Sequence, residues 1–370
     1  MKRNILVTGG AGFIGSFIVD ELVKKGNNVT ILDNLEPQVH QGKTPDYLNK
    51  KAKFVNGTVL NRNLVSSLVK DAEIIYHEAS MVGVGQSMYQ IAKYMEANTQ
   101  GTALMMDILV NEKHNVKKFI VAASMSSYGE GLYECPSCGL VKPPLRPESQ
   151  MKKGIWEPLC PNCGKQLKAL PTSEDTRQDA NSIYALSKKN QEETALMIGK
   201  TYGIPTIALR YFNVYGPRQS LSNPYTGVAA IFLSRLKNNN PPTVYEDGLQ
   251  TRDFISVHDV VQANTLAMEK KSADYETFNV GAGDPKTIVS IAETLAKLLG
   301  KKIKPNVTKQ FRKGDVRHCY ADISKIKKLG YKPKVSFEEG MKELIEWSAK
   351  TEAVDKFDQA ADELKKKGLI

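Results

Sequence analysis

The sequence lacks any apolar run that approaches eighteen residues, and it enters a short apolar strand-like segment, Asn4–Thr8, almost at once. A membrane-spanning helix needs about 20 apolar residues, and a secretory signal peptide needs an apolar stretch behind basic residues. We therefore expect no membrane span and no signal peptide, and we predict a cytoplasmic location. The chain of 370 residues, with 41% hydrophobic and 25% charged residues, suits one large or two smaller globular domains.

Cysteine is also scarce, and four of the five cysteines form two short motifs, Cys135-Pro-Ser-Cys138 and Cys160-Pro-Asn-Cys163. Their separation is close to that of a four-cysteine zinc ribbon. Because a cytosolic chain keeps its thiols reduced, a tetrahedral metal site is favoured over disulfides. The sequence therefore predicts one structural zinc ion without a catalytic part, whereas Cys319 is expected to be a small buried apolar residue.

A glycine-rich turn follows the first strand-like segment, and a helical pattern follows the turn from Ser16 onwards. Gly9 allows the tight turn, Gly12 lets the backbone approach a pyrophosphate, and Gly15 allows close packing of helix and strand. A second strand, residues 29–33, ends in Asp33, about 20 residues on, as the dinucleotide-binding fingerprint requires. A carboxylate at this point accepts hydrogen bonds from a ribose 2′-hydroxyl and repels a 2′-phosphate, which favours NAD over NADP.

Tyr184 lies four residues before Lys188 in a predicted helix, so the phenol and the ammonium group share one helix face. Forming a phenolate at pH 7 costs about 4 kcal/mol, since the pKa of free tyrosine is about 10. A cation about 4 Å away supplies about 4 kcal/mol at an effective dielectric constant near 20. Lys188, together with an oxidised nicotinamide, is therefore predicted to turn Tyr184 into a usable base.

Strand-like and helical patterns alternate along the chain, which predicts an α/β fold: a Rossmann-type doubly wound parallel sheet with a smaller C-terminal α/β substrate domain and a zinc-ribbon insertion. Further strands are expected at 53–56, 73–77, 118–123, 206–210 and 277–280, and long helices at 88–113 and 182–202. The predicted domains are the NAD-binding domain (1–130, 171–218 and 253–283), the ribbon (131–170), the substrate domain (219–252 and 284–350) and a C-terminal helix (351–370). This last helix is expected to lie on the surface, with one apolar side formed by Ala353, Phe357, Ala361 and Leu364.

Ordered motifs along nearly the whole chain resemble those of the extended short-chain dehydrogenases/reductases, in the group of NAD-dependent nucleotide-sugar epimerases and dehydratases. The motifs are Thr8-Gly-Gly-Ala-Gly-Phe-Ile-Gly15, Asp33-Asn34, His77-Glu-Ala-Ser80, Asn98-Thr-Gln-Gly-Thr102, Ser124-Met-Ser-Ser-Tyr-Gly129, Tyr184-Ala-Leu-Ser-Lys188, Arg210-Tyr-Phe-Asn-Val-Tyr-Gly-Pro217, Arg252-Asp-Phe254 and Arg312-Lys-Gly-Asp315. The resemblance implies NAD as cofactor, a nucleotide-diphosphate sugar as substrate, and a homodimer that pairs helices 88–113 and 182–202 between subunits.

The resemblance also implies roles for individual residues. Ser124 would orient the sugar hydroxyl, Tyr184 would be the acid and base, and Lys188 would hold Tyr184 and the nicotinamide ribose. Contacts to NAD are expected from Gly9, Gly12, Phe13, Ile14, Gly15, Asp33, Asn34, Thr58, Val59, Ala79, Asn98, Tyr184, Lys188 and Tyr211. Contacts to the substrate are expected from Ser126, Asn213, Val228, Tyr245, Arg252, Arg312 and Asp315.

The two residues after Ser124 separate the possible reactions. Dehydratases of this group carry an Asp-Glu pair there and decarboxylases carry a glutamate at the second position, whereas this chain has Met125 and Ser126. Without these carboxylates, we expect a transient ketone at carbon 4 that takes the hydride back on its other face, which is epimerisation. Relatives resembling dTDP-L-rhamnose 4-epimerases carry a similar insertion, which favours a dTDP-6-deoxyhexose such as dTDP-L-rhamnose over UDP-glucose or UDP-galactose.

Two departures from the family pattern concern the cofactor. Thr58 lies in a segment where an acid is usual, and Glu78 replaces a commonly apolar residue, so NAD is expected to exchange more readily than in tight-binding relatives.

Two alternatives stay open beside the epimerase. One is another nucleotide-sugar reductase or dehydratase of the same fold. The other is a nucleic-acid-binding module built on a degenerate reductase fold, suggested by the net charge of +11, by Trp156, which could stack a base, and by six basic against two acidic residues within 135–170. Nucleic acid is the less favoured partner because the lysines are spread over the chain and the set of Ser124, Tyr184 and Lys188 is intact.

Overall fold

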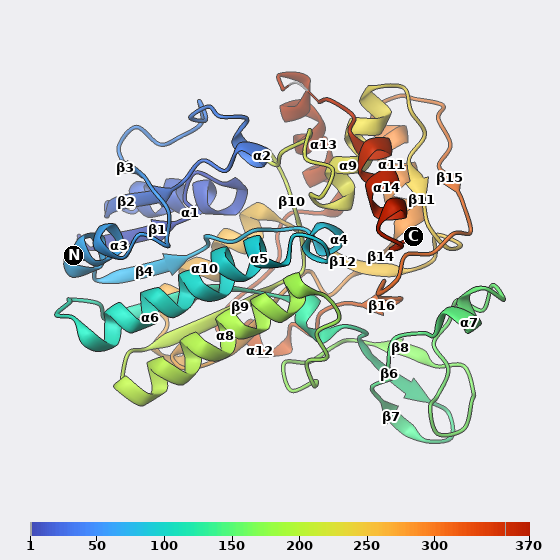
Figure 1. Ribbon diagram of the computed structural model, residues 1–370, viewed down its shortest axis with the longest axis horizontal. Helices are drawn as coiled ribbons and strands as arrows, with labels where there is room; N and C mark the ends of the chain where they lie inside the picture. Colours follow the sequence, from blue (N-terminus) through green and yellow to red (C-terminus); the bar gives the residue numbers. More distant parts are fainter. Residues whose placement is uncertain (1, 352) are drawn as a thin grey trace.

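The computed structural model describes residues 2–351 and 353–370, and its centre is a seven-stranded parallel sheet (Figure 1). The strand order is β13-β9-β5-β4-β1-β2-β3. These strands are β1 (Asn4–Thr8), β2 (Asn28–Asp33), β3 (Lys53–Asn56), β4 (Ile74–His77), β5 (Lys118–Ser124), β9 (Thr206–Tyr211) and β13 (Thr277–Val280). The strand order reverses at β1, which lies between β2 and β4. Ligands of doubly wound sheets bind outside the carboxyl ends of the strands at such a switch point.

Helices cover both faces of the sheet, because the strands are apolar on both sides. Ile5 and Val7 pack into one apolar cluster with α1 (Phe13–Lys24) and α10 (Val257–Glu269). Leu6, which points to the opposite face, packs into another cluster with three further helices. These are α3 (Arg62–Asp71), α6 (Gly101–Asn111) and α8 (Ile183–Tyr202). The predicted fold class is therefore confirmed, and every predicted strand is present within one residue at each end.

The predicted helix 88–113 differs from the structure at its start and in its interior. Met88 ends the short helix α4 (Val84–Ser87), and the long helix begins only at α5 (Ile91–Tyr94). A π-helix, η1 (Met95–Gln100), joins α5 to α6. π-turns interrupt the 3.6-residue period that a sequence pattern detects, and they are frequent near functional sites. The predicted helix 182–202 matches α8, which Ser182 caps.

A second lobe lies beyond the carboxyl ends of the sheet and packs around its own apolar cluster, which includes Tyr215, Phe232, Leu295 and Leu344. Its helices are α9 (Val228–Lys237), α11 (Ile288–Leu298) and α13 (Phe337–Ala349). Its strands are β10 (Asn213–Tyr215), β11 (Thr243–Val244), β12 (Thr251–Ser256), β14 (Pro285–Thr287), β15 (Asn306–Val307) and β16 (His318–Cys319). Short helices elsewhere are α2 (Pro37–His40), α12 (Ser324–Lys327), the 3-10 helix η2 (Met125–Tyr128) and the 3-10 helix η3 (Lys271–Ala273).

The insertion that carries the cysteines forms a three-stranded antiparallel sheet, which projects from the body in Figure 1. It contains β6 (Leu132–Cys135), β7 (Gly139–Val141), α7 (Glu148–Met151) and β8 (Lys168–Leu170). A small apolar cluster of its own includes Tyr133, Val141 and Leu167.

The C-terminal segment differs from its prediction. Helix α14 covers only Phe357–Lys366, and Ala353 precedes it; of the predicted ranges, Met1 and Glu352 lie outside the described residues. The apolar side of α14 does not rest on the outer surface but faces a large cavity, which Phe357, Ala361 and Leu364 help to line. Among the described residues, no helix is long and apolar enough to cross a membrane.

Candidate active site

One cavity of about 960 Å³ lies at the carboxyl ends of the parallel strands, between the sheet and the second lobe. Its volume falls in the upper part of the range of small-molecule and cofactor sites. Every predicted cofactor, catalytic and substrate residue except Asn98 lines it. Residues that lie 300 positions apart in the sequence, such as Gly12 and Arg312, therefore share one site.

The glycine turn forms the floor of this cavity before α1. Gly9 has a φ of +70°, and a Cβ there would lie 2.7 Å from the backbone nitrogen of Ala79. A Cβ on Gly15 would lie 2.2 Å from the carbonyl oxygen of Gly9, so helix and turn pack in contact. A Cβ on Gly12 would meet only that same oxygen, at 3.2 Å, and would otherwise extend into the cavity. The three positions thus have the separate reasons for glycine that the sequence predicts.

Asp33 ends β2 beside this turn and is held by backbone amides. Its Oδ2 accepts a hydrogen bond from the Ala11 nitrogen at 3.0 Å, and its Oδ1 accepts one from the Leu35 nitrogen at 2.9 Å. A carboxylate oxygen accepts more than one hydrogen bond, so each oxygen keeps acceptor capacity for a ligand. The other predicted residues that line the cavity near these segments in sequence are Phe13, Ile14, Asn34, Thr58, Val59 and Ala79.

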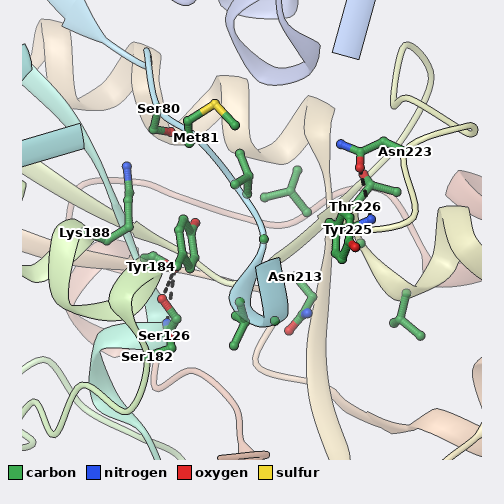
Figure 2. Close-up of a pocket in the computed structure, with 18 of the residues that line it drawn as sticks. Ser80, Met81, Ser126, Ser182, Tyr184, Lys188, Asn213, Asn223, Tyr225 and Thr226 are labelled. Carbon is green, nitrogen blue, oxygen red and sulfur yellow. Dashed lines mark hydrogen bonds between the residues drawn. The ribbon is translucent and has the colours of Figure 1, made fainter. Parts of the chain in front are cut away.

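Tyr184 and Lys188 project from the first turns of α8 into the cavity (Figure 2). The helix begins where the Ser182 hydroxyl accepts a hydrogen bond from the Ala185 nitrogen, at 3.1 Å. The Tyr184 nitrogen is satisfied from outside the helix, since it donates to the Ser87 hydroxyl at 3.0 Å. Two separate contacts therefore fix the start of the helix that carries both side chains.

Tyr184 and Ser124, which ends β5, both line the cavity. Burial raises the pKa of Tyr184, and the Ser124 side chain acts in the opposite direction. Burial also lowers the pKa of Lys188 to about 8, although Glu78 and Glu192 oppose this effect. The protein side chains alone therefore do not lower the phenol pKa in the way that the sequence predicts for Tyr184 with bound NAD, because burial outweighs the effect of Ser124.

Ser126 positions Ser124 as well as lining the cavity. The Ser124 oxygen accepts hydrogen bonds from the Ser126 nitrogen at 3.2 Å and from the Ser126 hydroxyl at 2.9 Å. Met125, between them, packs against the apolar cluster of the sheet. No carboxylate occupies the two positions after Ser124, as the sequence shows.

Asn98 is the one predicted site residue that does not line the cavity. It is fully buried in the π-helix η1, its Oδ1 accepts from the Met81 nitrogen at 2.7 Å, and its Nδ2 donates to the Met81 oxygen and the Ser187 hydroxyl. The Asn98 side-chain amide thus holds the Met81 segment against α8. Asn98 is therefore placed behind the cavity wall, and it is Met81 that faces the cavity.

The opposite wall carries the two predicted arginines. Arg252 is tied to main-chain oxygens of Thr251, Val316 and Arg317. Arg312 lies over the Tyr245 ring, 4.8 Å from its centroid, and its Nε donates to Asp315 at 2.8 Å. The planar guanidinium group of an arginine can donate two parallel hydrogen bonds, a geometry that suits phosphate oxygens. The remaining predicted substrate residues on this side are Asn213 and Val228.

The Asn213 side-chain oxygen is buried without a hydrogen-bond partner among the described residues. Buried polar atoms are usually satisfied, so this oxygen is available to accept a hydrogen bond from a ligand or a water molecule in the cavity.

Several lining residues were not predicted from the sequence. They include Glu78, Met81, Val82, Leu145, Gln219, Asn223, Tyr225, Phe357, Ala361, Leu364 and Leu369. The apolar positions of the C-terminal helix were recognised, but their partner surface was not, because nothing local shows which part of the molecule covers them.

A cluster of buried charges attaches the insertion to the second lobe beside the cavity. Both terminal nitrogens of Arg146 donate to Glu246 at 2.9 Å, and Arg317 donates to the same carboxylate. Arg317 also pairs with Glu157 of the insertion and with Asp247. Because Arg146 is buried and both its terminal nitrogens donate within this cluster, it does not present its charge to an outside partner such as nucleic acid.

The four cysteines of the insertion come together as predicted. Their sulfur atoms all lie within 4.8 Å of one another, and none forms a disulfide. Zinc–sulfur bonds of about 2.3 Å place tetrahedral sulfurs about 3.8 Å apart, so the cluster fits a zinc ion. Cys135 and Cys160 are buried, whereas Cys138 and Cys163 are exposed, and Cys319 is buried elsewhere, as expected.

Sequence comparison matches residues 5–150 to the NAD dependent epimerase/dehydratase family and residues 164–344 to the GDP-mannose 4,6 dehydratase family. A dTDP-L-rhamnose 4-epimerase of Burkholderia thailandensis is 34% identical over 94% of this chain and 95% of its own length. A putative UDP-glucose 4-epimerase of Methanocaldococcus jannaschii is 32% identical, with 93% of this chain and 97% of the relative covered.

Solved structures agree with the sequence relatives. A UDP-glucose 4-epimerase from Thermotoga maritima, solved with UDP-glucose, superposes with a TM-score of 0.77 and 32% identity over 94% of this chain and 99% of that chain. A UDP-glucuronic acid 4-epimerase from Bacillus cereus, solved with its nucleotide sugar and NAD, gives a TM-score of 0.77, with 27% identity, 94% coverage of this chain and 99% of that chain. The protein belongs to the NAD dependent epimerase/dehydratase family. The family and the Rossmann-type fold predicted from the sequence are thereby confirmed.

Proposed function

We propose that the protein is an NAD-dependent nucleotide-sugar 4-epimerase, an isomerase. The observation that carries the proposal is that Ser124, Tyr184 and Lys188 share one cavity with the glycine turn and with Arg252 and Arg312. The relatives named as 4-epimerases support it. Met125 and Ser126 supply no acid for elimination, which separates this site from that of a dehydratase.

The side chains of the cavity suit both the cofactor and the acid–base part of the reaction. Gly12 and the N-terminus of α1 would hold the pyrophosphate of NAD, and Asp33 the adenosine ribose. When bound, NAD supplies the hydride acceptor and donor for carbon 4. Tyr184 takes the proton of the 4-hydroxyl while Ser124 hydrogen-bonds the same oxygen, and Tyr184 returns the proton after the keto sugar has turned over. Because burial raises the pKa of Tyr184, the phenol would need the positive charge of bound oxidised nicotinamide beside that of Lys188 to act as a base near pH 7.

For the substrate we propose a dTDP-6-deoxyhexose such as dTDP-L-rhamnose, with UDP-glucose or UDP-galactose as the alternative. Met81, Met125 and Leu145 add apolar side chains to the cavity lining, and such a surface suits a methyl group at carbon 6 better than a hydroxymethyl group or a carboxylate. The similarity to the dTDP-L-rhamnose 4-epimerase over nearly the whole chain supports this choice.

The test is to incubate the purified protein and NAD with a panel of nucleotide sugars and follow inversion at carbon 4 by NMR. We expect inversion with a dTDP-6-deoxyhexose and slower or no inversion with UDP-hexoses. Inversion of UDP-hexoses alone would overturn the substrate proposal, and loss of water or of carbon dioxide would place the protein among the dehydratases or decarboxylases. No change in any sugar would overturn the epimerase.

We infer that Cys135, Cys138, Cys160 and Cys163 bind one structural zinc ion, which the closeness of their sulfur atoms supports. Metal analysis is expected to give about one zinc per chain, and Cys138→Ser is expected to lower that content. A folded protein purified without metal would contradict the inference.

We further propose a homodimer in which α5, α6 and α8 pair with the same helices of a second subunit. Exposed apolar side chains on these helices, Ile91, Leu186 and Met197, support it, since Met197 is 65% exposed. Light scattering is expected to give twice the mass of the chain, and a monomer would contradict the proposal. The domain boundaries and the cytoplasmic location stay predictions, which limited proteolysis and cell fractionation would test.

A further inference from the structure

Glu78 is a carboxylate in the wall of the cavity that the reaction described above does not use. It follows β4 directly, and its backbone lies against Gly9, because a Cβ on Gly9 would lie 2.9 Å from the carbonyl carbon of Glu78. Its side chain interacts with two other residues of the wall. The Tyr211 hydroxyl donates a hydrogen bond to its Oε1 at 3.0 Å, and the positive charge of Lys188 lowers the pKa of its carboxyl group. Glu78 thus lies between the glycine turn and the helix that carries Tyr184.

The groups around Glu78 leave its charge uncompensated at close range. Lys188 of α8 lowers the pKa of Glu78, but among the described residues no salt bridge within 4.0 Å joins a cation to its carboxylate. Tyr211 of β9 and Tyr76 of β4 also face it, and both stay neutral because burial raises their pKa far above the usual value. Asn264 of α10, which donates to the Tyr211 hydroxyl, carries no charge.

We propose that the Glu78 carboxylate sets the preference of the cavity between oxidised and reduced cofactor and makes that preference depend on pH. The proposal rests on the proposed function, since it needs nicotinamide in the part of the cavity that Tyr184 and Lys188 line. The nicotinamide ring carries a positive charge when oxidised and none when reduced, whereas the rest of the cofactor is the same. An ionised Glu78 therefore stabilises the oxidised form selectively.

The direction of the pH dependence follows from the titration of Glu78. Burial raises its pKa to about 7, with Lys188 and the Tyr211 hydrogen bond opposing. The group is neutral below that value and ionised above it, and bound NAD⁺ favours the ionised form, so the affinity for NAD⁺ should rise as the pH increases toward 7 and level off above it, while the affinity for NADH should change little. Lys188, whose pKa burial lowers to about 8, titrates over an overlapping range, so the comparison with Glu78→Gln, and not the pH range alone, identifies the contribution of Glu78.

Glu78→Gln tests the charge alone, because glutamine keeps an oxygen that can accept the Tyr211 hydrogen bond. Affinities of NAD⁺ and NADH are measured separately, by calorimetry and by nucleotide fluorescence, across pH 6 to 7.5 without substrate. In the wild-type protein, the ratio of the NAD⁺ affinity to the NADH affinity should rise by about fivefold, which equals about 20 mV for a two-electron couple. In Glu78→Gln the ratio should stay at its low-pH value throughout.

Glu36→Gln is the matched control. Glu36 also lines the cavity, but it follows β2 at the adenosine end and pairs with Lys93 at 2.7 Å, so its loss should change both affinities equally and leave the ratio intact. A ratio that is the same in the wild-type protein and in Glu78→Gln at every pH would overturn the proposal. Failure of both nucleotides to bind the wild-type protein would instead overturn the proposed function, so the two failures are distinguishable.

Discussion

The two walls of the cavity are built by different physical means. The sheet-end wall (Gly9, Asp33, Ser124, Tyr184 and Lys188) stands on the ends of parallel strands and on α8, and main-chain geometry and hydrogen bonds hold it. The outer wall (Tyr245, Arg252, Arg312, Asp315 and Leu364) comes from the second lobe and the C-terminal helix, and the cluster of buried charges around Glu246 supports it. The reacting groups therefore lie on regular strands and on a helix, whereas the groups that would determine substrate specificity lie on segments held together by contacts between distant parts of the sequence.

The first test removes the hydroxyl group of Tyr184, the proposed acid and base, from the sheet-end wall. Tyr184→Phe should lower turnover by about 10²- to 10⁴-fold, because the proton of the sugar hydroxyl loses its acceptor. NAD affinity, measured by calorimetry, should stay close to that of the wild-type protein. Tyr202→Phe, at the exposed end of the same helix, is the control and should leave both quantities unaltered. Retained activity in Tyr184→Phe would remove this phenol from the mechanism.

The second test breaks the support of the outer wall. Arg146→Met leaves the buried Glu246 with only part of its compensating charge, and losing one partner of a buried ion pair costs about 3–5 kcal/mol of unfolding free energy. Urea denaturation measures this loss. The control is Arg177→Met, whose ion pair with Asp179 is largely exposed and should contribute under about 1 kcal/mol. Equal effects of the two changes would show that the buried cluster does not stabilise the fold.

A third test distinguishes an effect on stability from an effect on cofactor affinity in the sheet-end wall. Gly12→Ala adds a methyl group that meets only the Gly9 oxygen, at 3.2 Å, so the unfolding temperature without cofactor should change little. The methyl group takes space next to the pyrophosphate, and NAD affinity should fall by about tenfold, or about 1.4 kcal/mol. Unaltered affinity would contradict the placement of the cofactor along this turn.

The smallest expected effect concerns the C-terminal helix. Leu364→Ala removes part of the cavity lining and should raise KM roughly fivefold with kcat unchanged, since it removes about 1 kcal/mol of apolar contact. Lys365→Ala, at the exposed neighbouring position, is the control. If steady-state kinetics gave the same KM for both variants, α14 would have no part in the outer wall.

The sequence predicted the sheet-end wall better than the outer wall, and the reason is the range of the contacts. The turn of Gly9, Gly12 and Gly15 and the pairing of Tyr184 with Lys188 depend on neighbours within one strand, turn or helix, which local patterns reveal. The bond of Arg146 to Glu246 spans 100 residues, and neither residue belongs to a motif. Asn98 was assigned to the cofactor from its motif, and only the folded structure shows its hydrogen bonds to Met81 and Ser187 behind the cavity wall. Glu78 was noted as a departure from the family pattern, and only folding brings it to Tyr211 and under the influence of Lys188.

The C-terminal segment has a practical consequence for any study of this protein. Leu369 lines the cavity, and its carbonyl oxygen accepts a hydrogen bond from the Lys313 nitrogen, in the loop that carries Arg312. A purification tag fused behind Ile370 would therefore start beside the cavity, and we expect it to alter the measured kinetic constants. Expression vectors with the affinity handle ahead of Met1 avoid this artefact, because β1 begins on the far edge of the molecule from α14 (Figure 1).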